Sequence, residues 1–566
     1  MSKLAQACRG SRSRAVWVLP ALLVAFNPAA RAVDVPTAGA VQQLERQQIE
    51  RLQQERRLRQ QPVKPDISLP AAPAAEAAST VKNIQVKTFR LDESAILGAD
   101  EIRAVLAPYE NQTLSLADLM GAVDALNALY QSKNMPTARA FLPPQEIRDG
   151  VVSIRLVEAR VGAITLGEAE QISTEFVTGR MNLARGDLMS VHTLEEDLVR
   201  FNRLHEVQLH ASVQPGTTAG TTDLLLTATE PRRYQYSVFA DNAGRYTVGE
   251  ERLGFVARAL GLTGRGDSLL FSAFFSEGSE SYYLGYSTPL TADDLKLDVS
   301  YNRGSIEVVE GAFVPLDVGG SSSDLTVGLT QPLIVNAQEL LNLYGRMASK
   351  ESISEFGNVT QLDLDLMVLS VGISGDRQQL DSVLTYDLNL NQGVKYLGGE
   401  ASFFAVRANA AWLGRYGTRS QLILRGGMQY SPTDLLPASE QFQLGGSASV
   451  RGYSEGLLSG RSGYLLSAEW RYALQNLDIG LPQGPDAPLF SAIAFVDHGG
   501  AFPYRPSPLD DVTQHDFLTG AGVGVLLDWK GRVTGRLAVA WPLTDNPAEA
   551  EQRKPRLHAA ISYNWL

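Results

Sequence analysis

The alternation of apolar and polar residues through residues 231–566 constrains the fold of this chain more than any other feature. Short alternating runs in this region are separated by Gly, Asp, Asn and Ser. In the run LTYDLNLN (384–391), every second residue is apolar: Leu384, Tyr386, Leu388 and Leu390. Successive side chains of an extended strand point to opposite faces, so each run predicts a strand with one apolar and one polar face.

A soluble β-sandwich also alternates, but the number of these runs and their polar faces favour a membrane barrel with a wet lumen. The run LKLDVSY (295–301), for example, carries Lys296 and Asp298 on its polar face. No stretch after residue 32 reaches the roughly 18 uninterrupted apolar residues of a membrane-spanning helix. At roughly 20 residues per strand and connection, the region predicts an all-β transmembrane barrel of about 16 antiparallel strands.

Residues 1–32 have the pattern of a secretory signal peptide. A basic start is followed by the apolar run AVWVLPALLVAF (15–26) and by the small-x-small sequence Ala30-Arg31-Ala32. We expect the exported chain to begin near Val33 and to contain no cysteine, since Cys8 is the only one. The net charge of −12 argues against a nucleic-acid partner.

Residues 33–61 predict a polar helix. The segment 41–61 is rich in helix-forming residues and has neither glycine nor proline before Pro62. Its apolar stripe is thin, as is typical of a solvated helix or a coiled-coil fragment, and consists of Val41, Leu44, Ile49 and Leu52. The repeated Pro and Ala of residues 62–80 predict an extended linker.

Two similar α+β modules are predicted next, at 81–159 and 160–230. In the first, a strand is followed by two segments with helical spacing, at 99–109 and 115–133, and then by two strands. The second repeats this order, with helical spacing at 172–181 and 191–204 and a closing strand pair at 206–216 and 222–230. Each module has a size that can fold independently.

Two short glycine-rich motifs interrupt the alternation: GGSASVRGY (445–453) and FVDHGGAF (495–502). Taken alone, Arg451 is interpreted as an exposed loop arginine and Asp497 as a turn aspartate. The glycines around Arg451 leave room for a tight turn. His498 beside Asp497 suggests a dyad, but a residue that merely flanks the motif is the simpler interpretation.

With these motifs, the chain resembles the TpsB transporters of two-partner secretion, whose type member is FhaC and whose superfamily includes the barrel-assembly protein BamA. The resemblance covers the whole predicted mature chain and is also carried by residues 142–158, 194–204 and 241–254. It implies that the modules are periplasmic POTRA (polypeptide-transport-associated) domains. It also implies an outer-membrane barrel at 231–566, in a Gram-negative bacterium, and a helix at 33–61 that plugs the barrel at rest.

The resemblance also assigns roles to the two motifs. The Val-Arg-Gly-Tyr sequence belongs to an extracellular loop that folds back into the barrel, here around 441–462, and its arginine pairs with the aspartate of a barrel-wall Phe-x-Asp-x-Gly motif. The implied pair is Arg451 with Asp497, which can meet bidentately. The remaining loop-motif residues are Gly445, Gly446, Val450, Gly452 and Tyr453, and the remaining barrel-wall residues are Phe495 and Gly499.

The function implied by the resemblance is export of one large exoprotein, an adhesin, a cytolysin or haemolysin, or a contact-dependent toxin, whose N-terminal secretion domain is recognised by the POTRA domains. Candidate contact residues for this partner lie at 194–204 and its adjoining strand: Leu194, Leu198, Phe201 and Leu204. Other expected partners are outer-membrane lipids and, during biogenesis, periplasmic chaperones and the barrel-assembly machinery.

Motifs of enzyme and cofactor chemistry are missing from the sequence. It contains no phosphate-binding loop with lysine, no His-Glu-x-x-His zinc pattern and no Gly-x-Ser-x-Gly elbow. We therefore expect no catalytic residue, cofactor or metal, and export without ATP. The alternative within the superfamily is a barrel-assembly factor. A porin or nutrient receptor would lack the modules and the loop motif, and an autotransporter would carry a long passenger region.

Overall fold

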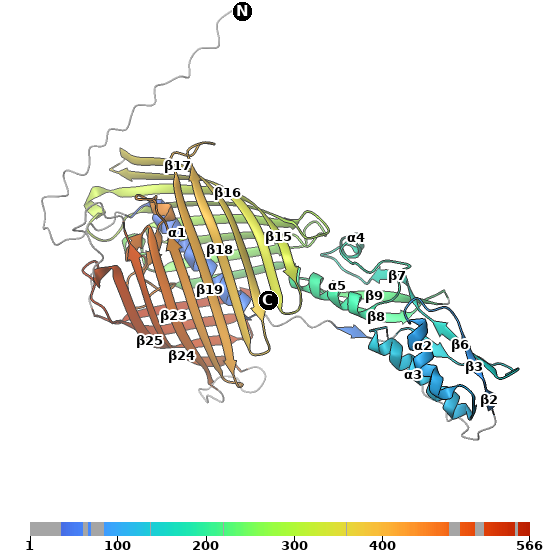
Figure 1. Cartoon of the computed structure of the whole chain (residues 1–566). Coiled ribbons are helices and arrows are strands. Elements are labelled where there is room, and N and C mark those ends of the chain that lie inside the picture. The colour runs from blue at the N-terminus through green and yellow to red at the C-terminus, as the bar shows by residue number, and fades with distance from the viewer. Residues whose placement is uncertain are drawn as a thin grey trace, which may run out of the picture.

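The described chain forms a barrel, a helix inside it, and two small modules that extend from one end of the barrel (Figure 1). The computed structural model describes residues 36–59, 66–68, 84–135, 137–218, 220–357, 359–474, 487–503, 514–549 and 553–565. The predicted signal peptide, residues 1–32, lies outside the described residues. No helix in the described ranges combines the length and the apolar character needed to cross a membrane.

Sixteen antiparallel strands close into the barrel, which confirms the number predicted from the alternation. Consecutive strands pair around the barrel, and the last pairs with the first, with Trp565 opposite Tyr236. The strands are β10 (Tyr234–Asp241), β11 (Arg252–Leu260), β12 (Ser268–Ser276), β13 (Ser279–Pro289), β14 (Lys296–Glu307), β15 (Val318–Val335), β16 (Glu339–Phe356), β17 (Val359–Gln378), β18 (Ser382–Val394), β19 (Phe403–Tyr416), β20 (Ser420–Tyr430), β23 (Ser462–Leu474), β24 (Leu489–Phe502), β25 (Phe517–Trp529), β26 (Val533–Pro542) and β27 (Arg556–Trp565).

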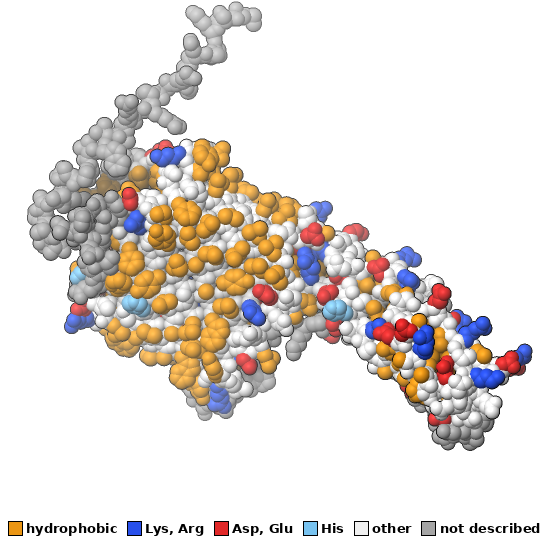
Figure 2. Space-filling model, in the orientation of Figure 1, with side chains coloured by type: hydrophobic (Ala, Val, Ile, Leu, Met, Phe, Trp, Pro, Cys, Tyr) orange, Lys and Arg blue, Asp and Glu red, His pale blue; other side chains and the backbone are white. Residues whose placement is uncertain are grey.

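The two faces of the barrel wall differ as the alternation predicts. On β18, Leu388 and Leu390 are exposed on the outside, whereas Thr385 and Asn391 are buried toward the lumen. Figure 2 shows hydrophobic side chains in bands across the visible outer surface of the barrel, while charged side chains gather at its margins and on the modules. An apolar exterior and a polar interior are the pattern of a transmembrane barrel.

Helix α1 (Ala38–Arg59) lies inside the barrel, where it contacts β14, β15, β16, β18 and β19 (Figure 1). Arg46 Nη2 lies 2.5 Å from Asp324 Oδ2 of β15. Val41 and Leu44 of the predicted stripe are buried, and so are Gln42, Gln43 and Glu45. The interpretation as a solvated helix is therefore wrong. The sequence pattern predicts that the polar residues of the helix face water, but the polar wall of the lumen surrounds them.

The first module contains two small sheets packed on two helices. Strands β3, β6 and β5 form one sheet, and β2 pairs with β4, a short strand that the sequence did not predict. Ser115 and Asp118 exchange hydrogen bonds in a capping box that starts α3. The elements are β2 (Ile84–Val86), β3 (Thr88–Leu91), α2 (Ala99–Leu106), η1 (Ala107–Tyr109), β4 (Gln112–Leu114), α3 (Leu116–Ser132), β5 (Arg139–Phe141) and β6 (Val151–Val157).

The second module has one sheet, in the order β1-β8-β9-β7, with two helices packed against it. Its helix α5 has the predicted bounds, but the other predicted helix is reduced to the five-residue α4. Strand β1 comes from the predicted linker and pairs in parallel with β8, with Ile67 opposite Ala211. The elements are β1 (Ile67–Ser68), β7 (Arg160–Leu166), α4 (Thr174–Thr178), α5 (Val191–Leu204), β8 (Gln208–Pro215) and β9 (Thr221–Thr229).

A buried charge cluster joins the second module to the barrel. Asp294, in the turn between β13 and β14, accepts from Arg180 Nε at 2.7 Å and lies 3.1 Å from His205 Nε2. Nearby, Arg203 of α5 donates to Asp376 of β17 at 2.8 Å. The His205 ring is also packed against Phe201, with ring centroids 4.4 Å apart. The module is thus fixed to the barrel through groups that water cannot easily reach.

The pKa values at this junction are shifted by burial and by the neighbouring charges. Burial lowers the pKa of the His205 imidazole, although its hydrogen bond to Asp294 opposes the shift. Burial by itself raises the pKa of Asp294, but the hydrogen bonds from His205 and Arg180 and the charge of Arg180 outweigh it and hold this pKa below its usual value. Docked His205 is therefore neutral at neutral pH.

Acidification should loosen this junction. Below about pH 6.5, an undocked His205 takes up a proton that the docked residue, with its lowered pKa, does not, so falling pH favours the undocked state. We expect the distribution of distances between spin labels on the second module and on the barrel, measured by double electron–electron resonance, to broaden from about pH 7.5 to about pH 5.5. His205→Gln should abolish this pH dependence, and His192→Gln, at an exposed position, should retain it. Identical distributions at both pH values in the parent chain would contradict this assignment.

Candidate functional site

The segment between β20 and β23 turns back into the barrel. Its short strands β21 (Phe442–Leu444) and β22 (Leu458–Gly460) pair with each other and contact the wall strand β24. At its tip, Val450 and Tyr453 are buried in a small apolar cluster with Leu518 of β25. This packing fixes the tip against the inner wall.

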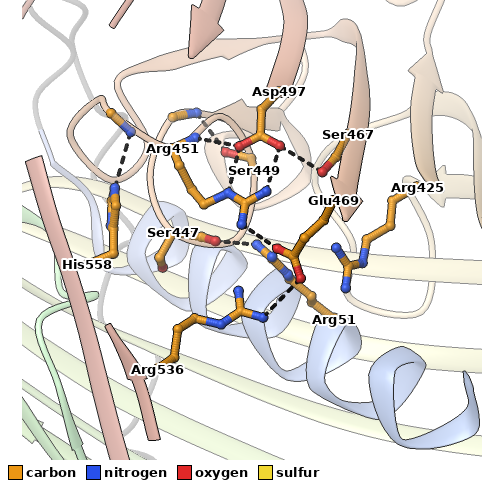
Figure 3. Close-up of polar contacts among 12 residues, drawn as sticks. Arg51, Arg425, Ser447, Ser449, Arg451, Ser467, Glu469, Asp497, Arg536 and His558 are labelled. Atoms are coloured by element: carbon orange, nitrogen blue, oxygen red, sulfur yellow. Dashed lines mark hydrogen bonds and ion pairs between the residues drawn. The ribbon is translucent and has the colours of Figure 1, made fainter. Parts of the chain in front are cut away.

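Arg451 at the tip meets Asp497 of β24 in a bidentate pair (Figure 3). Arg451 Nε lies 2.7 Å from Oδ2 and Nη2 lies 2.9 Å from Oδ1, and the Arg451 backbone N–H also donates to Oδ2. The side chain of Arg451 is 1% exposed and that of Asp497 is 0% exposed. The Arg451 guanidinium carbon stands 3.4 Å from the centroid of the Phe495 ring. Both sequence motifs therefore meet at one buried point.

The strand alternation explains why Asp497 faces inward. Its neighbour Val496 is 47% exposed on the outer surface, so Asp497 must point into the lumen. The other neighbour, His498, also lies on the opposite face and hydrogen-bonds Tyr464 and Thr519. The structure therefore brings Arg451 and Asp497 together but does not form a His498–Asp497 dyad.

A second carboxylate, which sequence reasoning missed, completes the site. Glu469 of β23 is 0% exposed, and its Oε2 accepts from Arg451 Nη1 at 2.5 Å. Its other oxygen is 2.6 Å from Arg471 Nη2 and 3.6 Å from Arg536 Nη2. Ser467, also missed, donates to Asp497 at 2.7 Å. The signal was available, since Ser467, Glu469 and Arg471 are the inward positions of the alternating run SAEWRYAL.

Glycines of the loop motif permit backbone conformations that other residues rarely adopt. Gly445, Gly446 and Gly452 have φ of +112°, +99° and +100°. A Cβ on Gly446 would overlap the Glu455 carboxylate, and on the facing wall a Cβ on Gly520 would overlap the Arg451 carbonyl oxygen. Gly520 therefore lets the loop approach the wall this closely, and Gly446 leaves space for the Glu455 carboxylate within the loop.

Other predicted motif residues hold the tip in place. The Tyr453 hydroxyl lies 2.8 Å from the backbone carbonyl oxygens of both Thr519 and Thr544, to either of which it can donate, and the Gly452 N–H donates to His558 Nε2 at 3.1 Å. Gly499 lies against Leu444 of the loop, with no room for a Cβ. Among the described residues, no three His, Cys, Asp or Glu side chains are grouped as metal ligands.

The candidate partner-contact residues of the second module do not lie on its surface, with one half-buried exception. Leu194, Leu198 and Phe201 are buried in the core of this module, and Leu204 is half-buried. They point inward because the apolar face of the amphipathic α5 covers the sheet. A partner cannot contact these three buried side chains unless the core opens, so the structure assigns them to the stability of the module.

The fold and its anchored loop define the class of this protein: an outer-membrane β-barrel transporter with periplasmic modules. Residues 220–527 match the family described as haemolysin secretion/activation protein ShlB/FhaC/HecB, and residues 84–159 match the POTRA domain, ShlB-type. The chain belongs to this family, whose transporters serve two-partner secretion.

Individual relatives are similar to nearly the whole chain. The outer membrane transporter CdiB of Dickeya dadantii (strain 3937) is 26% identical over 552 residues, which cover 93% of each chain. The heme/hemopexin transporter protein HuxB of Haemophilus influenzae (strain 86-028NP) is 25% identical over 508 residues, 85% of this chain and 88% of HuxB. The structure of CdiB from Escherichia coli superposes with a TM-score of 0.67 at 22% identity, over 94% of this chain and 100% of that one.

Replacing Arg451 by lysine should weaken the anchor. Lysine keeps the charge but cannot meet Asp497 bidentately. Complete loss of one partner of a buried pair typically costs about 3 to 5 kcal/mol of stability, so we expect this substitution, which removes only part of the interaction, to cost a fraction of that. We expect Arg451→Lys to lower the temperature at which the barrel unfolds, read as the change in gel mobility on heating in detergent. Arg461→Lys, at a partly exposed arginine of the same loop, is the matched control. If the two variants unfold at the same temperature, the anchor does not stabilise the barrel.

Proposed function

We propose that this chain forms the outer-membrane pore for one large partner exoprotein, that α1 closes the pore at rest, and that the periplasmic modules receive the partner. The observation that carries the proposal is α1 itself, a polar helix held inside a closed barrel by side chains of the wall and of the anchored loop. The membership in a transporter family and the POTRA domain at 84–159 support it.

The contacts of α1 suit a removable plug. Most are polar: Gln48 accepts from Arg252 and donates to the Ala243 carbonyl oxygen, and Gln443 of the loop donates to the Ala40 carbonyl oxygen. Near the end of the helix, Leu58 packs against wall residues of β18, β19 and β20. Water can replace polar partners when the helix leaves, so release costs less than the extraction of an apolar helix from a core.

The partner would be received by strand addition in the periplasm. In the first module, β3 and β5 are the outer strands of their sheet, and Phe141 on β5 is exposed. An extended segment can pair with such an edge through its backbone and place alternate side chains in apolar surroundings. In the second module, β1 already covers the edge of β8.

The remaining parts of the proposal concern energy and environment. The chain acts as a transporter without a catalytic step, and folding of the partner outside the cell drives its movement. Membrane lipids cover the apolar outer face, and periplasmic chaperones and the barrel-assembly machinery act during biogenesis. Two relatives are named for their cargo, the heme/hemopexin transporter protein HuxB and the hemolysin transporter protein HpmB, and they indicate the kind of exoprotein that this chain exports.

The secretion proposal is tested by co-expressing this chain with a large exported protein encoded beside it. We expect the exoprotein in the medium when the chain is present, and in the periplasm, degraded or retained, when the chain is absent. An Arg461→Lys chain should support secretion to the parent level. Equal amounts of exoprotein in the medium with and without the chain would end the proposal.

Removal of α1 should open the pore. Deletion of residues 38–59 leaves the loop as the described segment that fills the lumen, so we expect larger and longer-lived single-channel currents in planar lipid bilayers. The matched control is Arg57→Ala, which changes an exposed side chain of the same helix and should keep the small currents of the parent. An unchanged conductance after the deletion would contradict the role of α1 as a plug.

A further inference from the structure

One carboxylate of α1 lies among three arginines of the barrel wall. Glu55 Oε1 is 2.8 Å from Arg425 Nη2 on β20, 3.6 Å from Arg536 Nη2 on β26 and 3.8 Å from Arg471 Nη2 on β23. Arg425 and Arg471 are buried and Arg536 is partly exposed, while Glu55 belongs to the helix that the pore releases. The wall therefore presents a cluster of guanidinium groups, and in the resting state a glutamate of the chain itself occupies it.

The wall lacks enough negative charge to neutralise this cluster without Glu55. Among the described residues, Glu469 is the other carboxylate that forms ion pairs with Arg471 and Arg536. Glu469 is also bound to Arg451, and Asp497 is engaged by Arg451 and Ser467. When α1 leaves, three guanidinium groups face one shared carboxylate.

Arg425 also has unused hydrogen-bonding capacity. Its Nε and Nη1 have no acceptor among the described residues, although the side chain is only 7% exposed. A planar guanidinium with free N–H groups is suited to a second carboxylate oxygen, which a single monodentate glutamate does not supply. Figure 3 shows Arg536 paired with Glu469, which also meets Arg451, and Arg425 on the side of Glu469 that is turned away from Asp497.

We propose that Arg425, Arg471 and Arg536 form a carboxylate-binding site on the wall of the open lumen, which takes Asp and Glu side chains of the polypeptide in transit. The inference rests on the proposed function and names the chemistry that the pore recognises in its cargo. The resting Glu55 shows how such a side chain lies in the site. Because a passing chain must also leave, the site has to bind each carboxylate only briefly, as in other pores.

The site also gives a physical reason for exchange between plug and cargo. An acidic segment that reaches the cluster competes with Glu55 for the same guanidinium groups, so its arrival weakens the hold on α1. A segment with glutamine in place of glutamate offers no charge and competes poorly. The pore would therefore open more readily for an acidic stretch than for a neutral stretch of the same size.

The test compares two synthetic peptides, which differ only by glutamate or glutamine in a Gly/Ser background, as blockers of single-channel current. The full chain carries Glu55→Gln to vacate the site, and deletion of residues 38–59 supplies the open lumen if that variant stays closed. We expect the glutamate peptide to reside in the pore at least about threefold longer than the glutamine peptide. Adding Arg536→Gln should bring the ratio close to one.

The matched control is Arg346→Gln, which removes the same charge from β16, where Arg346 stacks on Tyr344 outside the cluster. It should leave the residence ratio unchanged. Equal residence of both peptides in the channel whose site has been vacated, or an equal loss with Arg346→Gln and Arg536→Gln, would overturn the proposal. Secretion of the exoprotein is measured in parallel. If the two peptides do not differ while secretion is intact, the proposed carboxylate site is contradicted and the proposed function is not. Loss of secretion in the parent removes the proposed function.

Discussion

The pairing of β27 with β10 is the constraint on which the rest of the structure depends. A strand in a membrane has no water to satisfy its backbone N–H and C=O groups, so the sheet has to close without a free edge. Closure around sixteen strands encloses a wide lumen. That lumen must be filled or gated, and here a helix and an inward loop occupy it. The helix and the loop inside the barrel therefore meet a requirement that the size of the barrel sets.

The contents of the lumen are held by two different kinds of contact. The loop is held by buried groups that satisfy one another almost completely, as Arg451 does with Asp497 and Glu469. Helix α1 is held by separate polar contacts along its length and by one incompletely neutralised arginine cluster. A buried pair is costly to break when one charge is left without a partner, whereas Arg471 and Arg536 keep Glu469 when α1 leaves. In the proposed cycle, this difference lets the loop remain fixed while the helix moves.

Much of this architecture could be predicted from the sequence, because it depends on periodicity. The alternation predicted the barrel and its faces, and the amphipathic spacing predicted α5 to its end residues. Motif resemblance brought Arg451 together with Asp497. Glu469 and Ser467 were missed because the partner of an inward polar side chain is known only once its neighbours across the lumen are known. The burial of Leu194, Leu198 and Phe201, which the sequence offered as candidate partner contacts, could not be predicted for a related reason, since an apolar helix face does not say whether it covers its own sheet or another molecule.

The pairing of β1 with β8 has a consequence for the return of the plug. From Arg59 to Ile67 the chain can span at most about 28 Å, while α1 is about 33 Å long. As long as β1 stays paired, the end of the helix remains within that reach of the second module, even when the helix has left the barrel. The helix is then a tethered ligand at high effective concentration rather than a free one. If α1 leaves the pore as proposed, reclosure after each export event is an intramolecular step, and its rate does not depend on how many transporters the membrane holds.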